Sequence, residues 1–237
     1  MTAANATESS WGWYCGDDSG TDIVQGKKMG ICLGDEFSIK WMENADAVDE
    51  TKESLKGQFD VVQQEVNKSH VQKFGDLSFV SSPLATFLGA EAASYDLKPR
   101  AQEGKATVDS RDAKLVHLRW QLAELKAAES GATAEEVAAA EEELTAEEAS
   151  RLAATRLFEA VWTRVSGLRA AQMLQLYMPP RNFDCHRAVL SASEVQYTDY
   201  SLKYHSVVVN LCEMGFAPQN ITAAFAAAAA VVLVEKA

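Results

Sequence analysis

The chain has 237 residues, and its 22 Lys and Arg stand against 34 Asp and Glu, which gives a formal net charge of −12. This acidic balance excludes a generic basic protein that binds nucleic acid through its phosphates. Hydrophobic residues make up 47% of the chain, enough for a core in one large domain or two small ones. The longest apolar run, residues 221–234, is shorter than the roughly 20 residues that span a bilayer, so we predict no transmembrane helix.

Residues 1–80 mix turn signals with short apolar stretches, a pattern typical of α/β folds. Apolar side chains recur every three or four residues from 51 to 66, which predicts an amphipathic helix with Thr51 as its N-cap. Residues 77–80, Leu-Ser-Phe-Val, follow a Gly-Asp turn and are predicted to form a strand. Periodicity is lost from 81 to 110, where we predict a linker.

The next part of the chain has the apolar spacing of helices. Leucines recur every three or four residues from 115 to 125, and a second apolar stripe follows residues 158–168. The tetrad Thr-Ala-Glu-Glu begins at Thr133 and again at Thr145. Each copy has the form of a capping box, which predicts two helix starts.

Pro179-Pro180 is predicted to end this helical region. Three further helices are predicted over about 184–195, about 199–213 and from about 218 onward, which completes a module of about five helices. Glutamates crowd residues 135–148, and a solvated helix face explains them most simply. The alternative is a contact that acid releases, because carboxylates lose their charge as the pH falls towards about 4.

The cysteines lie in two widely separated pairs and form no CxxC motif: Cys15, Cys32, Cys185 and Cys212. Pairing within each cluster would close two short loops, each stabilising by about 3 kcal/mol in the chain-entropy model. The alternative is that all are free thiols of a cytosolic protein.

Asn-x-Ser/Thr sequons occur at Asn5, Asn67 and Asn220. Together with the even number of cysteines they favour an oxidising lumen. The first ten residues, however, lack the basic and apolar regions of a secretory signal. These two observations conflict.

Residues 5–15 contain Glu-Ser-Ser-Trp, and residues 32–46 contain Leu-Gly-Asp-Glu-Phe-Ser-Ile-Lys-Trp-Met-Glu. Both stretches resemble the legumain family of asparaginyl endopeptidases, also called vacuolar processing enzymes. The resemblance continues in order through residues 51–76, which are similar to the end of the catalytic domain. Val108–His117 resembles the junction where the prodomain is cleaved, and the Asp-Cys-His-Arg and Val-Asn-Leu-Cys stretches of residues 184–212 resemble the helical prodomain.

The resemblance implies that Ser9, Ser10 and Asp35 line the pocket for the substrate asparagine and that Trp11 flanks the substrate backbone. A buried carboxylate accepts the two N–H donors of an asparagine amide, and a hydroxyl completes the set. An ionised aspartate would face Asp35 carboxylate to carboxylate, so the pocket should accept Asp only in acid. The ordinary alternatives are a turn aspartate after Gly34 and a packed tryptophan.

Family catalysis uses a cysteine nucleophile and a histidine base, and their motifs do not occur in this sequence. The histidines lie in the wrong segments: His70, His117, His186 and His205. We therefore predict no catalytic residue, no turnover by this chain alone, and no cofactor or metal. The catalytic half normally precedes residue 1, and we expect that the chain lacks its true beginning, which would explain the missing signal.

The resemblance implies an α/β remnant of a caspase-like catalytic domain followed by an all-α helical prodomain, a death-domain-like bundle. Residues 1–80 are assigned to the peptidase domain, 81–112 to a linker or activation segment, and 113–237 to the prodomain. The implied partners are protein or peptide substrates, the chain's own catalytic half and a second proenzyme in a homodimer, with no nucleic acid and no membrane. The implied location of the full-length parent is the vacuole or lysosome lumen, or outside the cell.

Asp109 stands where the family junction usually has asparagine, so we predict that it is cut only when protonated, near or below about pH 4. The resemblance also implies a disulfide at Cys185 and a pair like Cys15 and Cys32, and it places Asn67 on the surface as the glycosylation site. Three functions compete. They are the C-terminal part of an asparaginyl endopeptidase with its autoinhibitory prodomain, a non-catalytic module that binds in trans, and a plain helical interaction protein.

Overall fold

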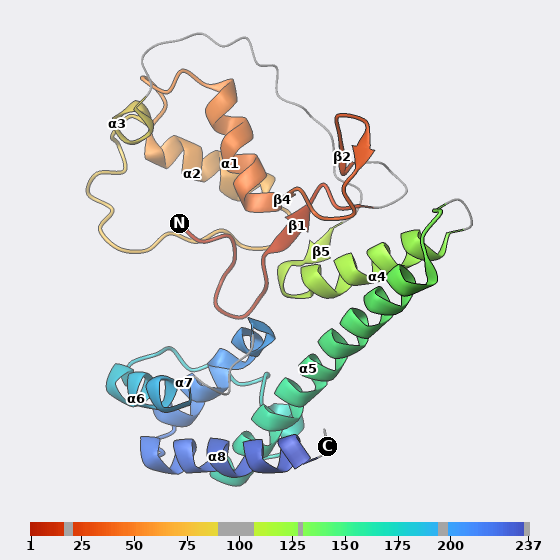
Figure 1. Ribbon diagram of the computed structural model, residues 1–237. Coiled ribbons are helices and arrows are strands. Elements are labelled where there is room, and N and C mark those ends of the chain that lie inside the picture. The colour runs from red at the N-terminus through yellow and green to blue at the C-terminus, as the bar shows by residue number, and fades with distance from the viewer. Residues whose placement is uncertain (17–20, 90–106, 128–129, 194–198, 235–237) are drawn as a thin grey trace. The chain divides into compact units, whose positions relative to one another are not determined.

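The computed structural model describes residues 1–16, 21–89, 107–127, 130–193 and 199–234 (Figure 1). The chain divides into two compact units, Met1–Thr133 and Ala134–Ala237. Helices with a small sheet agree with the expected combination of an α/β segment and a helical segment. Among the described residues, no helix is long and apolar enough to cross a membrane.

The first unit is built around a three-stranded antiparallel sheet in the order β4-β1-β5 (Figure 1). Strand β1 (Trp11–Trp13) lies in the centre, between β4 (Gly34–Asp35) and β5 (Val108–Asp109). A separate two-stranded hairpin joins β2 (Ile23–Val24) and β3 (Lys27–Lys28). The chain therefore returns to β1 after about seventy residues to complete the sheet.

Helices α1 (Glu36–Ala47) and α2 (Leu55–Glu65) pack together in this unit. The core has Phe59, Val62, Val66 and Val71 at its centre, and Phe37 and Trp41 of α1 pack against it. The apolar stripe predicted from 51 to 66 is thus confirmed as the buried face of α2.

The predicted N-cap and the predicted strand are both wrong. Ser54, not Thr51, caps α2, because the Ser54 side chain accepts from the Gly57 N–H at 3.0 Å. Thr51 instead donates its hydroxyl to Asp49 Oδ1 at 2.5 Å. Residues 77–80 form turns, with Val80 N donating to the Leu77 carbonyl, and short helix α3 (Ala85–Leu88) follows.

Much of the predicted linker, residues 90–106, lies outside the described residues. After it, α4 (Ala113–Lys126) confirms the predicted leucine-patterned helix and contacts β5 within the first unit. The division into units falls at Thr133, whereas the domain boundaries at 80, 112 and 113 remain a prediction.

The second unit consists of helices around one apolar core. Its longest element is α5 (Ala134–Ser166), and the others are α6 (Phe183–Ser193), α7 (His205–Glu213) and α8 (Pro218–Val234). Short 3-10 turns cover Ala170–Gln172 and Asp199–Tyr204. The predicted helices near 184–195, 199–213 and 218 are confirmed to within a few residues.

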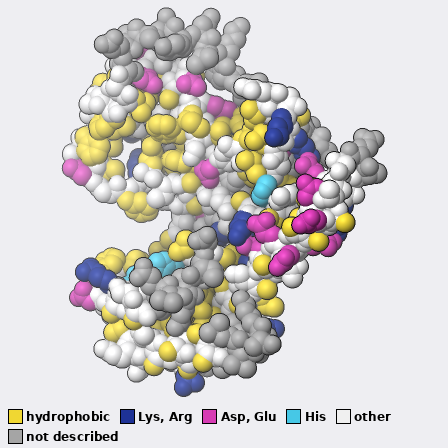
Figure 2. All heavy atoms as spheres, in the orientation of Figure 1, with side chains coloured by type: hydrophobic (Ala, Val, Ile, Leu, Met, Phe, Trp, Pro, Cys, Tyr) yellow, Lys and Arg dark blue, Asp and Glu magenta, His cyan; other side chains and the backbone are white. Residues whose placement is uncertain are grey.

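Of the two helix starts predicted in the glutamate-rich stretch, the one at Thr133 agrees with the start of α5 at Ala134, and the one at Thr145 is wrong. Thr145 lies inside α5, and its hydroxyl donates to the Glu141 carbonyl at 2.8 Å, one turn back. A threonine whose hydroxyl donates to the carbonyl one turn back lies inside a helix and does not cap its start. Figure 2 shows acidic side chains over the N-terminal part of α5. The helix ends at Ser166, well before Pro179.

Candidate substrate-binding site

The sheet brings the predicted pocket strand and the predicted cleavage junction side by side. Trp11 pairs with Asp109, and Gly12 pairs with Val108, although about one hundred residues separate them. The buried Ser9 donates its hydroxyl to Asp109 Oδ1 at 2.5 Å. Asp109 is therefore held by hydrogen bonding on the strand that was predicted to bind substrate.

Ser10 continues the same contact one residue further along. Its carbonyl accepts the Ser110 N–H at 3.0 Å, and its hydroxyl donates to Ser110 Oγ at 3.0 Å. The Asp109 carboxylate also accepts the Arg111 N–H at 2.9 Å, which closes a turn before α4. The junction thus adds an extended strand to β1, the way in which many peptides bind to a sheet edge.

Asp35 lies on the other side of β1, where it pairs with Gly12. Its carboxylate accepts the Ser38 N–H at 3.2 Å and caps α1, so it fills the ordinary turn role. Paired residues of antiparallel strands share a face, and consecutive residues alternate. Trp11 and Asp109 therefore occupy one face of the sheet, and Asp35 occupies the other, two strand spacings or roughly 10 Å away.

Trp11 is half-buried, and the Lys68 ammonium lies 6.0 Å from its ring centroid. Lys68 follows α2 in sequence, so a cation from that connection reaches the aromatic ring of the pocket strand. At this distance the cation–π attraction is weak, on the order of 0.5–1 kcal/mol for an exposed pair. Because the Trp11 ring is half exposed, it is compatible with both predicted roles, packing and contact with the substrate.

A disulfide backs the opposite face of the pocket strand. Cys15 is bonded to Cys32, and a Cβ built on Gly12 would lie 2.8 Å from the Cys32 sulfur. Such an approach is too close for any side chain, so only glycine fits between β1 and the disulfide. Gly12 was not predicted from the sequence, because a glycine between two tryptophans of a strand becomes a signal only beside the disulfide.

The second disulfide joins Cys185 of α6 to Cys212 of α7 in the helical unit. Disulfide pairing within each cluster is thereby confirmed, and the free-thiol alternative is wrong. Because every cysteine of the chain is bonded, none offers a thiolate nucleophile. Among the described residues, no group of three or more His, Cys, Asp or Glu is placed to hold a metal.

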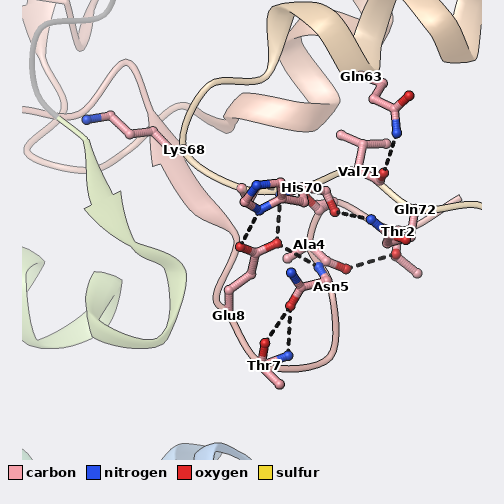
Figure 3. Close-up of polar contacts among 12 residues, drawn as sticks. Thr2, Ala4, Asn5, Thr7, Glu8, Gln63, Lys68, His70, Val71 and Gln72 are labelled. Carbon is pink, nitrogen blue, oxygen red and sulfur yellow. Dashed lines mark hydrogen bonds and ion pairs between the residues drawn. The ribbon is translucent and has the colours of Figure 1, made fainter.

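Two carboxylates, one buried and one half-buried, bind the segment after α2, and neither was predicted from the sequence. Glu36 is 1% exposed, and its two oxygens accept the N–H groups of Asn67 and Lys68 at 3.1 and 3.2 Å. Glu8 accepts from His70 in the same segment (Figure 3). Glu8 belongs to the Glu-Ser-Ser motif, which was the available signal, but only the two serines were given roles.

The glycosylation sequon lies in this same connection. Asn67 is exposed, as the family resemblance implies, and its side chain donates to the Glu65 carbonyl at 2.9 Å. Ser69, which completes the sequon, is buried and donates to the Ala3 carbonyl at 2.6 Å. Glycosylation of Asn67 stays a prediction.

The histidines have structural partners. The His70 ring contacts Glu8, and His117 Nδ1 lies 2.7 Å from the Gly30 carbonyl oxygen. His186 of α6 and His205 of α7 face each other, with ring centroids 5.1 Å apart. Burial lowers the pKa of His186, and burial together with the neighbouring His186 lowers the pKa of His205.

The comparisons with known proteins bear on the same part of the chain as this sheet and its motif residues. Residues 1–90 match the model of the Peptidase C13 family, a family of cysteine peptidases. The resemblance to the legumain family is thereby confirmed.

The relatives over nearly the whole chain are vacuolar-processing enzymes. The delta-isozyme of Arabidopsis thaliana is 28% identical over 91% of this chain, and the enzyme of Vicia sativa is 28% identical over 97%. The enzyme of Glycine max is 34% identical over 51% of the chain and 26% of its own length. The chain spans about half the length of the first two relatives, 48% and 49%.

Proposed function

We propose that the chain is the C-terminal part of a legumain-type cysteine endopeptidase that cleaves proteins after Asn, and after Asp in acid. In this proposal residues 1–80 are part of a caspase-like domain, 81–112 are the activation segment, and 113–237 are an autoinhibitory, death-domain-like prodomain. The contact that carries the proposal is the hydrogen bond from Ser9 to Asp109. A cleavage-site residue seated on a substrate strand is what self-inhibition before processing requires.

The proposed site uses Ser9, Ser10 and Trp11 to receive the extended backbone and the side chain before the cleaved bond. Asp35 would read the asparagine amide with its carboxylate. In the described structure this carboxylate caps α1 and lies across the sheet from Asp109. Its role in recognition therefore requires a substrate that reaches the face of the sheet opposite Trp11.

The catalytic cysteine and histidine would come from the other half of the peptidase domain. Large apolar side chains are exposed on the first unit, including Phe74 at 72%, Phe79 at 46% and Phe87 at 55%. Figure 2 shows hydrophobic side chains over the region of α1 to α3. Exposed apolar patches of this kind typically mark interaction surfaces, and the catalytic half is the proposed partner.

The paired cysteines and the sequon at Asn67 support an oxidising compartment for the full-length parent, and the relatives are named vacuolar-processing enzymes. We therefore propose the vacuole or lysosome lumen as its location, or secretion. Pairing of proenzymes as a homodimer is part of the same proposal.

The test is a fusion of the N-terminal half of the Glycine max enzyme to residue 1, assayed on an Ala-Ala-Asn reporter peptide. We expect turnover by the processed fusion, and we expect Asp35→Ala to reduce kcat/KM by roughly a hundredfold or more. The matched control is Asp60→Ala, which removes an exposed carboxylate on α2 that pairs with Lys56. A folded fusion without asparaginyl cleavage would refute the proposal.

The alternative is a non-catalytic module that inhibits a complete peptidase in trans, and the absence of any free thiol in the chain favours it. The purified chain should show no turnover of the reporter at about pH 4 to 6 under either function. The fusion described above distinguishes the two functions, because only the first predicts that the fusion cleaves the reporter. Robust turnover by the chain alone would contradict both.

A further inference from the structure

Side-chain hydrogen bonds stabilise the turn of residues 5–8 that precedes the pocket strand. Asn5 Oδ1 accepts both the N–H and the hydroxyl of Thr7 at 2.9 Å, and Glu8 Oε1 accepts the Asn5 N–H at 2.8 Å (Figure 3). Residues 5–8 therefore form a compact loop whose end is the Glu8 carboxylate. Because Ser9 follows directly, the position of this loop determines where its hydroxyl points.

The same carboxylate ties the loop to the connection after α2. Glu8 Oε1 also accepts the His70 N–H at 2.7 Å, and Glu8 Oε2 lies 2.8 Å from His70 Nδ1 (Figure 3). Thr2 and Gln72 exchange backbone hydrogen bonds of 2.9 and 3.1 Å nearby. Glu8 is thus the last side-chain link between the two segments before the chain enters the pocket strand.

On its other side, Glu8 meets the junction segment. Its carbonyl accepts from Arg111 Nη2 at 3.3 Å, and the adjacent Ser9 donates to Asp109. The residue therefore stands between the connection at His70 and the segment at Asp109, with contacts to both. No other role for this carboxylate follows from the proposed peptidase chemistry.

We propose that Glu8 is a positioning residue. Its carboxylate clamps the 5–8 loop to His70 and thereby orients the Ser9 hydroxyl towards the residue bound at the pocket strand, which is Asp109 in this structure. The inference rests on the proposed function of the pocket strand and adds to it the side chain that orients Ser9. A carboxylate suits the task, because one oxygen can receive two backbone N–H groups while the other receives the imidazole.

The charges around the clamp make it resistant to acid. Burial raises the pKa of Glu8, but hydrogen bonds from the Asn5 N–H and from His70, with the charge of the imidazole, bring the pKa below its ordinary value of 4.5. The clamp is therefore complete above pH 4.5 and is lost only as the pH falls through the lowered pKa. Arg111 is the cation that faces it from the junction, and Lys68 is directed at Trp11.

An amide in place of the carboxylate gives a signature that simple packing would not give. In Glu8→Gln the amide oxygen can still receive the two backbone N–H groups, and the amide N–H can donate to a neutral His70 ring. Glu8→Met has a similar length but offers no acceptor to these N–H groups. Glu8→Gln should therefore keep the clamp, whereas Glu8→Met should lose it.

The experiment is residue-resolved hydrogen exchange on the full chain. We expect Glu8→Ala to speed exchange of the Asn5, His70 and Ser110 amides by about tenfold, the effect of losing hydrogen bonds to a charged group. Glu8→Gln should match the wild type, whereas Glu8→Met should match Glu8→Ala. The control is Asp49→Ala, which removes another carboxylate that holds a turn, through Thr51, and should leave Ser110 unchanged.

Unchanged exchange at Ser110 in folded Glu8→Ala, or equal exchange in Glu8→Gln and Glu8→Met, would overturn the proposal. If Glu8→Ala does not fold, His70→Ala takes its place, because the His70 side chain is 77% exposed and its loss removes one arm of the clamp. A confirmed clamp in a fusion enzyme that does not cleave after Asn would refute the peptidase function and leave the positioning intact. The two failures are thus distinguishable.

Discussion

Acid should destabilise the helical unit through the His186–His205 pair. Both rings have a lowered pKa in the folded state, chiefly through burial, so the unfolded chain binds more protons below the ordinary value of 6.5. Stability is therefore present above pH 6.5 and is lost as the pH falls towards the folded-state values. The direction is opposite to that of a histidine stabilised by a carboxylate partner.

Repulsion between the two protonated rings adds to the effect of burial, and the size of this repulsion follows from the separation of the rings. Two unit charges 5.1 Å apart repel by roughly 3 kcal/mol at an effective dielectric constant of about 20. Partial exposure of both rings screens this to about 1–2 kcal/mol. Glu213 offsets part of it, because its charge attracts the protonated His186 and the Arg181 and Asn182 N–H groups keep its own pKa low.

The assay is urea unfolding at about pH 7.5 and about pH 5, followed by the indole N–H signal of Trp162. Trp162 is fully buried, and its indole donates to the Arg169 carbonyl at 3.2 Å, so it reports on this unit alone. Between the two pH values, the free energy of unfolding of His205→Gln should fall by about 1–2 kcal/mol less than that of the wild type. His117→Gln, in the first unit, is the control. Equal pH dependence in the wild type and His205→Gln would refute the electrostatic reasoning.

Three further predictions follow from single contacts. Asp109→Asn in a complete enzyme should move self-processing to higher pH, and equal rates of both versions between about pH 4 and 6 would contradict this. Gly12→Ala should prevent formation of the Cys15–Cys32 disulfide and cost about 2–4 kcal/mol, seen as two reactive thiols in a labelling assay. Asn210→Ala should cost about 2–4 kcal/mol in urea unfolding, because the buried Asn210 side chain bonds the Met178 N–H and the Leu176 carbonyl; a loss below about 1 kcal/mol would contradict this.

Local signals predicted the helices well, because apolar spacing is set by the helix itself. The helix predicted near 218 begins at Pro218, where proline suits a first turn. The same local reasoning was wrong at Thr145, where the capping-box letters occur inside a helix. It was also wrong at residues 77–80, where Leu77 and Phe79 are exposed and no strand partner is present among the described residues.

The site was predictable only in part. The motif residues Ser9, Ser10 and Asp35 could be chosen from the sequence, but their neighbours could not, because a strand pairing across about one hundred residues leaves no local pattern. The contact of Ser9 with Asp109 depends on that pairing, and so does the position of Asp35 on the opposite face of the sheet. The clamp at Glu8 likewise depends on a connection more than sixty residues away.

The pairing of β5 with β1 means that the edge of the pocket strand is occupied by a tethered ligand. A segment joined to its site by the same chain can compete at an effective concentration in the millimolar range. An outside peptide of micromolar affinity would therefore be excluded while Val108 and Asp109 remain in place. Cutting the chain near this segment would leave its contacts with β1 unchanged but would remove the tether, so the segment would bind weakly and could dissociate on dilution.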